Sequence, residues 1–125
     1  MGILQGLMGN ASRVEVAQVQ TDLAPMLVEG ETVHLAYRVL RDLVVFTNKR
    51  LISVNKQGLT GAKVEYMSIP YRNIQRFSVE NAGAFDMDAE LKVWVSGSVT
   101  PIAFTFGRGE SVAPIARGLA TYVLG

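Results

Sequence analysis

The hydrophobic pattern near the N-terminus predicts a helix. Apolar residues recur at helical spacing over residues 16–27, as they do along the buried stripe of an amphipathic helix. Ser12 and Glu15 have the spacing of a capping box, which predicts that the helix begins directly after Ser12. Pro25 removes a backbone donor and disfavours helix before it, so we expect the helix to end or kink there, with Gly30 in the following turn.

From Val33 the hydrophobic period changes to two, and the pattern predicts seven short strands. Each strand alternates apolar and polar residues or forms a short β-branched or aromatic run. The expected strands cover residues 33–40, 43–47, 50–54, 63–69, 74–80, 90–95 and 102–106. Their connections are short and rich in Asn, Gly, Ser and Pro, which favour turns. Seven strands joined in this way are typical of an antiparallel barrel or sandwich.

The period returns to helical near the C-terminus. Apolar residues form a wide stripe over residues 112–123, after a candidate cap at Ser111. The opposite face holds only Arg117, Gly118 and Thr121. Because so few charges face away from the stripe, we expect this helix to be covered on more than one side and to plug the open end of the barrel.

Composition describes a small domain with few charges. The 125 residues, of mass 13.6 kDa, correspond to one domain. Charged residues make up 18% of the chain, against about 25% in an average soluble domain, and the mean hydropathy is +0.23. With so few charges, an isolated domain exposes apolar surface, and other subunits can cover that surface. The net charge of +1 excludes a nucleic-acid binder that depends on many phosphate contacts.

The sequence lacks the residues on which disulfides and several kinds of catalytic and metal site depend. Cysteine is absent, which excludes disulfides, thiolate catalysis and Cys-ligated zinc. His34 is the single histidine, so His-based metal clusters and acid–base triads have no members. We therefore expect no catalytic residue, no cofactor and no metal, and a chain that is not an enzyme. No apolar run approaches the ~18 residues of a membrane span and no secretory signal is evident, so we expect a cytoplasmic protein.

Particular segments carry a resemblance to a known family. They are Phe46–Ile52, Tyr66–Ile74, Phe77–Glu80 and the acidic-apolar stretch Phe85–Leu91. Over roughly residues 30–125 the chain resembles the bacterial pleckstrin-homology-like (PH-like) domain family. The resemblance implies a mainly β fold with terminal helices, in which a seven-stranded antiparallel barrel of two near-orthogonal sheets is capped by the C-terminal helix. Residues 1–29 then form an N-terminal helical extension.

The same resemblance implies a role without catalysis. Members of the family are described as cyclic homo-oligomers whose suggested role is protein binding, and no catalytic residues come with the resemblance. We therefore expect a scaffold or protein-binding module that assembles into a ring, with a pentamer as the expected size and a protein partner that the sequence does not identify.

Basic residues in the middle of the chain are the candidate site for an anion or an acidic partner. Residues 33–80 carry eight basic groups against three acidic ones, a net charge of +5. The candidates are Arg38, Arg41, Lys49, Arg50 and Lys56. They favour an alternative function, binding of an anionic lipid or phosphate ligand at a membrane. Against it, the connection at residues 40–42 is too short to wrap a phosphoinositide headgroup as the longer loop of eukaryotic relatives does.

Trp94 is the candidate interface residue. The alternation of residues 90–95 assigns the odd positions to the core, so Trp94 is expected on the outer face of its strand. A tryptophan there is typical of an interface anchor, and packing under a terminal helix is the alternative. Arg72 and Arg76 are candidates for ion pairs between subunits, although an exposed pair contributes less than about 1 kcal/mol.

Overall fold

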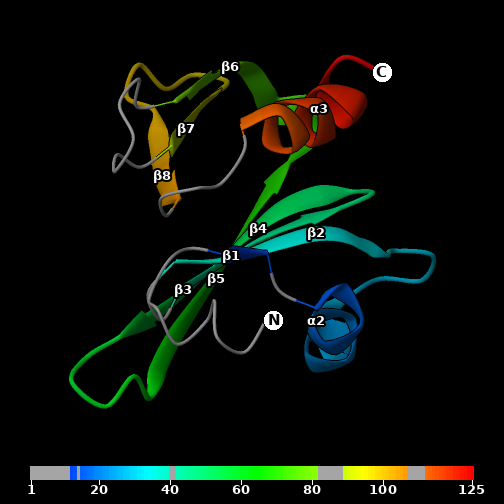
Figure 1. Ribbon diagram of the computed structural model, residues 1–125, viewed down its shortest axis with the longest axis vertical. Helices are drawn as coiled ribbons and strands as arrows, with labels where there is room; N and C mark the ends of the chain where they lie inside the picture. The colour runs from blue at the N-terminus through cyan, green and yellow to red at the C-terminus, as the bar shows by residue number, and fades with distance from the viewer. Residues whose placement is uncertain (1–11, 14, 40–41, 82–88, 107–111) are drawn as a thin grey trace.

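The computed structural model describes residues 12–13, 15–39, 42–81, 89–106 and 112–125 (Figure 1). Its elements are β1 (Ser12–Arg13), α2 (Val16–Leu23), η1 (Ala24–Met26), β2 (Val33–Val39), β3 (Asp42–Thr47), β4 (Arg50–Gln57), β5 (Lys63–Pro70), η2 (Tyr71–Asn73), β6 (Ile74–Glu80), β7 (Ala89–Val95), β8 (Ile102–Phe106) and α3 (Val112–Val123). The seven predicted strands correspond to β2–β8, so the mainly β fold with terminal helices is confirmed.

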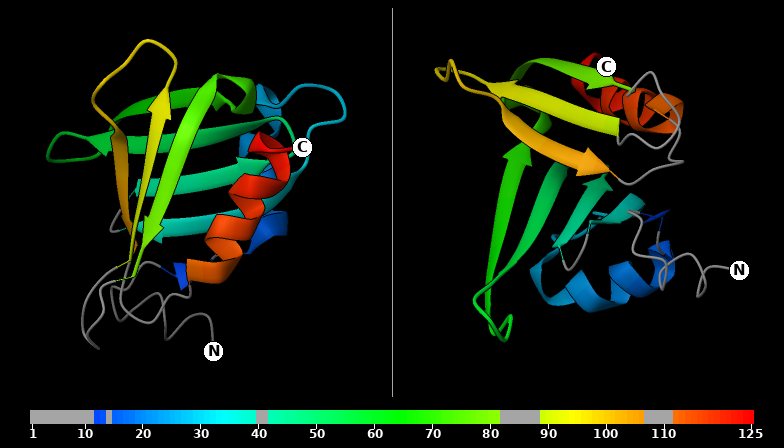
Figure 2. Two further views of the ribbon diagram at one scale, coloured as in Figure 1. Left: turned by 90° about the horizontal axis from the view of Figure 1, so that it is seen from above. Right: turned by 60° about the vertical axis from the view of Figure 1, so that its left-hand side comes forward.

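The strands form two antiparallel sheets. One has the order β1-β2-β3-β4-β5 and the other the order β6-β7-β8. The chain passes from the first sheet to the second through η2, directly after Pro70. In Figure 2 the strands of one sheet cross those of the other, and α2 and α3 lie on opposite faces of the larger sheet.

The main core lies between the two sheets, with α3 covering its end. Ile115 and Leu119 of α3 are fully buried in a cluster that contains residues of both sheets. Tyr37 of β2 stacks on Phe106 of β8, with ring centroids 5.0 Å apart, and so joins the sheets at one corner. The C-terminal helix therefore caps the barrel, as the apolar stripe predicted.

A second core lies on the outer face of the larger sheet. Val19 and Leu23 of α2 pack there against Ala36, Val45 and Ile52. The sheet is thus buried on both faces, which the alternation of the sequence did not reveal. The predicted division at residues 29 and 30 stays a prediction, although α2 shares this core with the strands.

The start of the N-terminal helix differs from the prediction. Ser12–Arg13 is not a cap but a short strand, β1, which pairs antiparallel with the edge of β2. The helix begins at Val16, and its N-cap residue Glu15 makes no capping hydrogen bond through its side chain. The backbone groups along an open strand edge therefore outweigh the local capping pattern. The end of the helix is as predicted, since α2 stops at Leu23 and Pro25 lies in the short turn η1.

The helices are short. α2 has 8 residues and α3 has 12, whereas a transmembrane helix needs about 20. Within the described part of the chain, no helix is long and apolar enough to cross a membrane. The predicted cap at Ser111 lies outside the described residues.

Candidate functional site

Phe46–Ile52, one of the segments that carry the family resemblance, surrounds a buried carboxylate. The Glu31 side chain accepts hydrogen bonds from the Thr47 hydroxyl (2.7 Å), from Arg50 Nε (2.8 Å) and Nη2 (3.0 Å) and from the backbone N–H of Val28 (3.0 Å). Only 4% of Glu31 is exposed. A buried charge is tolerated when it is paired and hydrogen-bonded in this way. We call Glu31, Thr47 and Arg50 the Glu31 latch.

The latch holds Glu31 in its charged form. Desolvation raises the pKa of the Glu31 carboxyl, but the hydrogen bonds from Arg50, Thr47 and the Val28 backbone outweigh it, so the pKa lies below its ordinary value. The Arg50 guanidinium also donates to Ser68 Oγ (2.9 Å) and to the carbonyl of Met26 (2.8 Å). Arg50 therefore has its charge compensated within the domain.

Asn48 attaches the same turn to the loop before β2. Its side chain accepts from the backbone N–H of Thr32 (2.8 Å) and donates to the carbonyl of Gly30 (3.1 Å). Tyr71 donates to the carbonyl of Thr47 (2.7 Å) from the other side. The polar residues of the motif thus fix the β3–β4 turn. Lys49 is the exposed residue between them.

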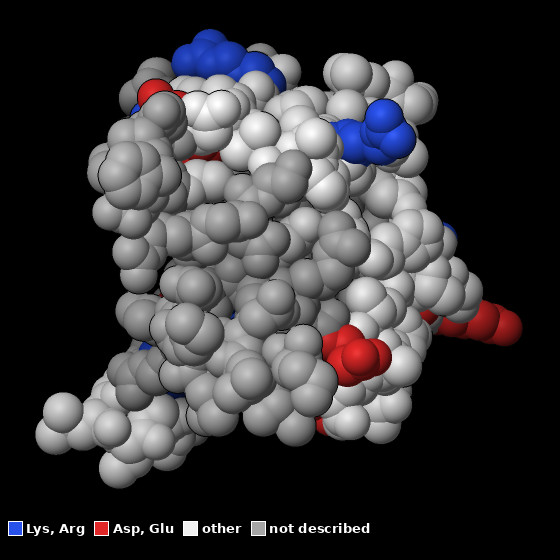
Figure 3. All heavy atoms as spheres, viewed as in Figure 1, with Lys and Arg blue, Asp and Glu red and all other residues white. Residues whose placement is uncertain are grey.

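The predicted basic residues do not gather in one place. Lys49 and Arg50 lie at the β3–β4 turn, whereas Lys56 lies six residues further along β4, a distance of about 20 Å at ~3.3 Å per residue. Arg38 is exposed near the Lys56 end of the sheet, and Arg41 lies outside the described residues. On the face drawn in Figure 3, basic side chains are few and widely separated.

None of the described elements covers the outer face of the smaller sheet, whereas α2 covers that of the larger sheet. Helix α3 packs into the core on the inner side of the smaller sheet. Its outward residues are exposed on β6 and β8 and half-buried on β7. They are Arg76, Ser78, Glu80, Glu90, Lys92, Trp94, Ala103 and Thr105. We call these eight residues the outer face.

Trp94 and Arg76 form a pair on the outer face. They are opposite each other in the register of β6 and β7, and the Arg76 guanidinium carbon lies 4.5 Å from the centre of the Trp94 ring. This is a cation–π contact. The predicted position of Trp94 on the outer side of its strand is confirmed, and its role at an interface stays a prediction. Arg72 is exposed in η2, before the sheet begins.

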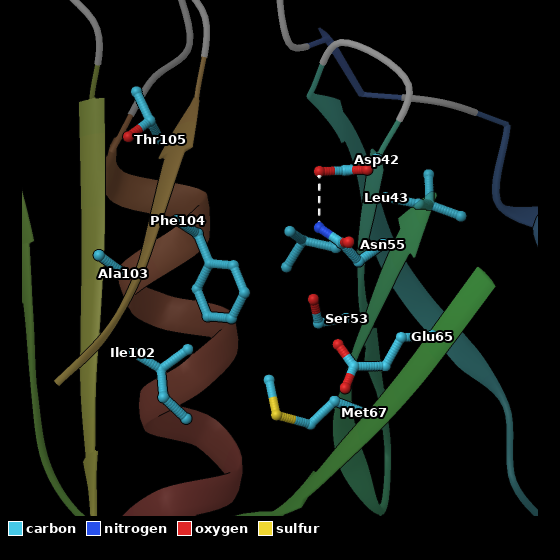
Figure 4. Close-up of a pocket in the computed structure, with 11 residues that line it drawn as sticks. Asp42, Leu43, Ser53, Asn55, Glu65, Met67, Ile102, Ala103, Phe104 and Thr105 are labelled. Carbon is cyan, nitrogen blue, oxygen red and sulfur yellow. Dashed lines mark hydrogen bonds between the residues drawn. The ribbon is translucent and has the colours of Figure 1, made fainter. Parts of the chain in front are cut away.

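A cleft opens between the two sheets on the other side of β8 (Figure 4). It has a volume of about 350 Å³ and is lined by residues of β3, β4, β5 and β8. One wall carries Asp42, Asn55 and Glu65, and the other carries Ile102 and Phe104. No pattern in the sequence indicates this cleft, because its residues come from strands that are separated along the chain.

His34 helps to hold α3 in place. The Tyr122 hydroxyl is hydrogen-bonded to His34 Nδ1, and the Tyr122 ring stacks on Tyr71 with centroids 5.0 Å apart. Burial raises the pKa of the Tyr122 hydroxyl above its ordinary value. The single histidine of the chain thus joins β2 to the C-terminal helix.

Comparisons with known proteins agree with this architecture. The family model described as the bacterial PH domain matches residues 2–123. The uncharacterized protein YjqA of Bacillus subtilis (strain 168) is 54% identical over 121 residues, which are 96% of this chain and 97% of YjqA. YozO of the same organism is 33% identical over 82 residues, or 66% of this chain and 71% of YozO.

Two solved structures of pleckstrin-homology domain proteins are similar to this chain over almost its whole length. A pleckstrin-homology domain protein from Shewanella loihica PV-4 has a TM-score of 0.85 at 48% identity, over 92% of this chain and 98% of that one. The pleckstrin homology domain from Shewanella amazonensis SB2B has a TM-score of 0.79 at 51% identity, over 98% and 99% of the two chains.

Proposed function

Since the chain belongs to the bacterial PH domain family, we propose that it is a non-enzymatic protein-binding module that assembles with copies of itself into a ring. The observation that supports this function is the outer face of β6–β8. It is the face of a sheet that no described element covers, and it carries the single tryptophan of the chain beside an arginine. Tryptophan and arginine are among the residues enriched at interface hot spots.

The charges of the outer face favour contact with another copy. Arg76 and Lys92 are basic, whereas Glu80 and Glu90 are acidic. Lys92 Nζ lies 3.7 Å from Glu90 Oε1. A surface with both signs can meet a second protein without a large excess of like charge. In the proposed ring the outer face of one copy contacts a different surface of the next copy, because such head-to-tail contacts close into a ring when the rotation between copies permits. A ring also covers sheet edges. A pentamer is the ring size that we expect from the family.

The experiment is the solution mass of the untagged protein, measured by light scattering after size-exclusion chromatography at micromolar concentration. We expect a multiple of 13.6 kDa for the natural sequence and a mass close to one chain for Trp94→Ala, because the side chain at the centre of the contact is lost. Leu59→Ala is the control, since Leu59 is fully exposed between β4 and β5. A monomeric natural protein, or an unchanged mass for Trp94→Ala, contradicts the proposal.

The alternative function, binding of an anionic lipid or phosphate, has less support. It needs several free cations on one surface. Arg50 is paired with Glu31, and Lys49 and Lys56 lie at opposite ends of β4. We therefore rest the proposed function on the outer face.

A further inference from the structure

We propose that the cleft between the sheets binds an extended basic peptide segment of a partner protein, with one Lys or Arg side chain inserted between the two walls. The cleft lies between the sheets, whereas Trp94 lies on the outer face of β7, and the two share only Ala103 and Thr105 at the edge of β8. The proposal rests on Asp42, Glu65 and the inward residues of β8 rather than on Trp94, and it names a ligand class that the proposed function leaves open.

The acidic side chains of the cleft favour a positively charged ligand. Its lining includes two carboxylates, Asp42 and Glu65, and no Lys or Arg among the residues that the structure describes. Asp42 is fixed by Asn55 Nδ2 (3.1 Å) and by the backbone N–H of Lys56 (3.0 Å). Glu65 is exposed, and its carboxylate makes no hydrogen bond or ion pair with any residue that the structure describes. A cation that enters therefore meets one positioned and one free carboxylate.

The opposite wall selects a cation with an apolar stem. Ile102 and Phe104 of β8 face Met67 of β5 across the cleft in Figure 4. An aliphatic stem buries apolar surface there while its charged end reaches the carboxylates, and the Phe104 ring offers a further contact to a cation. The apolar wall offers no oxygen ligand to a metal ion. In addition, no cluster of three potential metal ligands occurs among the described residues.

The strand edges beside the cleft favour a peptide over a free amine. β5 ends the order of the larger sheet and β8 ends that of the smaller sheet, so each has one paired and one unpaired edge among the described strands. An unpaired edge binds an extended chain through backbone hydrogen bonds while alternate side chains enter pockets. The volume of about 350 Å³ is near the lower limit of ligand sites, about 300–1,000 Å³, and accommodates a side chain rather than a helix.

The test is a fluorescence anisotropy titration of the full chain with two labelled peptides, acetyl-Val-Arg-Val-Arg-Val and acetyl-Val-Gln-Val-Gln-Val. We expect the arginine peptide to bind and the glutamine peptide to bind at least about five-fold more weakly, with the difference reduced at high salt. Glu65→Gln is expected to weaken binding of the arginine peptide by about five-fold. Glu29→Gln is the control, because it removes an exposed carboxylate from the distant loop before β2 and is expected to change nothing.

A second variant tests the cavity itself. Ser53 lines the cleft, and Ser53→Leu fills it without a change of charge, so binding of the arginine peptide is expected to be lost. The thermal midpoint shows whether this variant is folded, and Glu65→Lys replaces it if it is not. Equal binding of the two peptides overturns the proposal, as does equal binding by the natural protein, Glu65→Gln and Glu29→Gln. Loss of self-assembly is read separately, from the mass of each variant.

Discussion

At the scale of single residues, the Glu31 latch explains the polar residues of the Phe46–Ile52 segment. Thr47 and Arg50 both bind the Glu31 carboxylate, and Asn48 binds the loop on which Glu31 lies. The sequence shows Thr47, Asn48 and Arg50 as a compact motif, but it gives no sign that their partner is an acidic residue before β2. The sequence alone therefore presents Arg50 as a free cation, whereas in the structure it is paired with Glu31.

The latch predicts a large effect of Glu31→Gln on stability. Gln keeps the shape of the side chain but leaves the partly buried Arg50 guanidinium without its counter-charge. We expect the free energy of unfolding, measured with urea at neutral pH, to fall by about 2–3 kcal/mol. Glu29→Gln, in the same loop but exposed, is expected to change it by less than about 0.5 kcal/mol. Equal effects of the two variants contradict this role of the latch.

The difference in stability between the natural protein and Glu31→Gln is predicted to depend on pH. The pKa of Glu31 is lower in the folded state than its ordinary value, so its carboxylate stabilises the fold above that ordinary value, about 4.3, and loses this contribution as the pH falls through the folded pKa. The natural protein loses this contribution in acid, but Glu31→Gln has none to lose. The stability difference between them is therefore expected to shrink as the pH falls below about 4.3, and a difference that stays constant in acid contradicts this role of Glu31.

At the scale of elements, tertiary contacts decide what local patterns leave open. The period of two predicted the strands because side chains alternate between the faces of a sheet. The pattern does not say whether the second face is covered, and α2 buries Ala36 and Val45 there. The capping box at Ser12 was wrong because the edge of β2 pairs with that segment.

The second core predicts that α2 contributes to global stability. Leu23 is 5% exposed in the contact between α2 and the larger sheet. We expect Leu23→Ala to lower the free energy of unfolding by about 2–4 kcal/mol, because the change removes buried methyl groups and leaves a cavity. The exposed Leu59→Ala is the control in the same urea series. A similar small effect for both leucines is inconsistent with a docked α2.

At the scale of the whole molecule, charge counted along the chain is a poor guide to charge on the surface. Residues 33–80 carry a net charge of +5, yet Arg50 is compensated by Glu31 from outside that segment. The same segment supplies Asp42 and Glu65, the two carboxylates of the cleft. The position of Trp94 followed from alternation within one strand, whereas the cleft needs the topology that brings β8 across β3–β5.

The central claim is that copies of the chain meet at the outer face, and the fluorescence of Trp94 tests it most directly, because Trp94 is the single tryptophan. The measurement is acrylamide quenching at micromolar concentration, for the natural protein and for Thr105→Arg, which adds a bulky charge to the exposed end of the same face. We expect stronger quenching in Thr105→Arg, because Trp94 is then no longer covered by a second copy. Equal quenching of the two proteins contradicts the account.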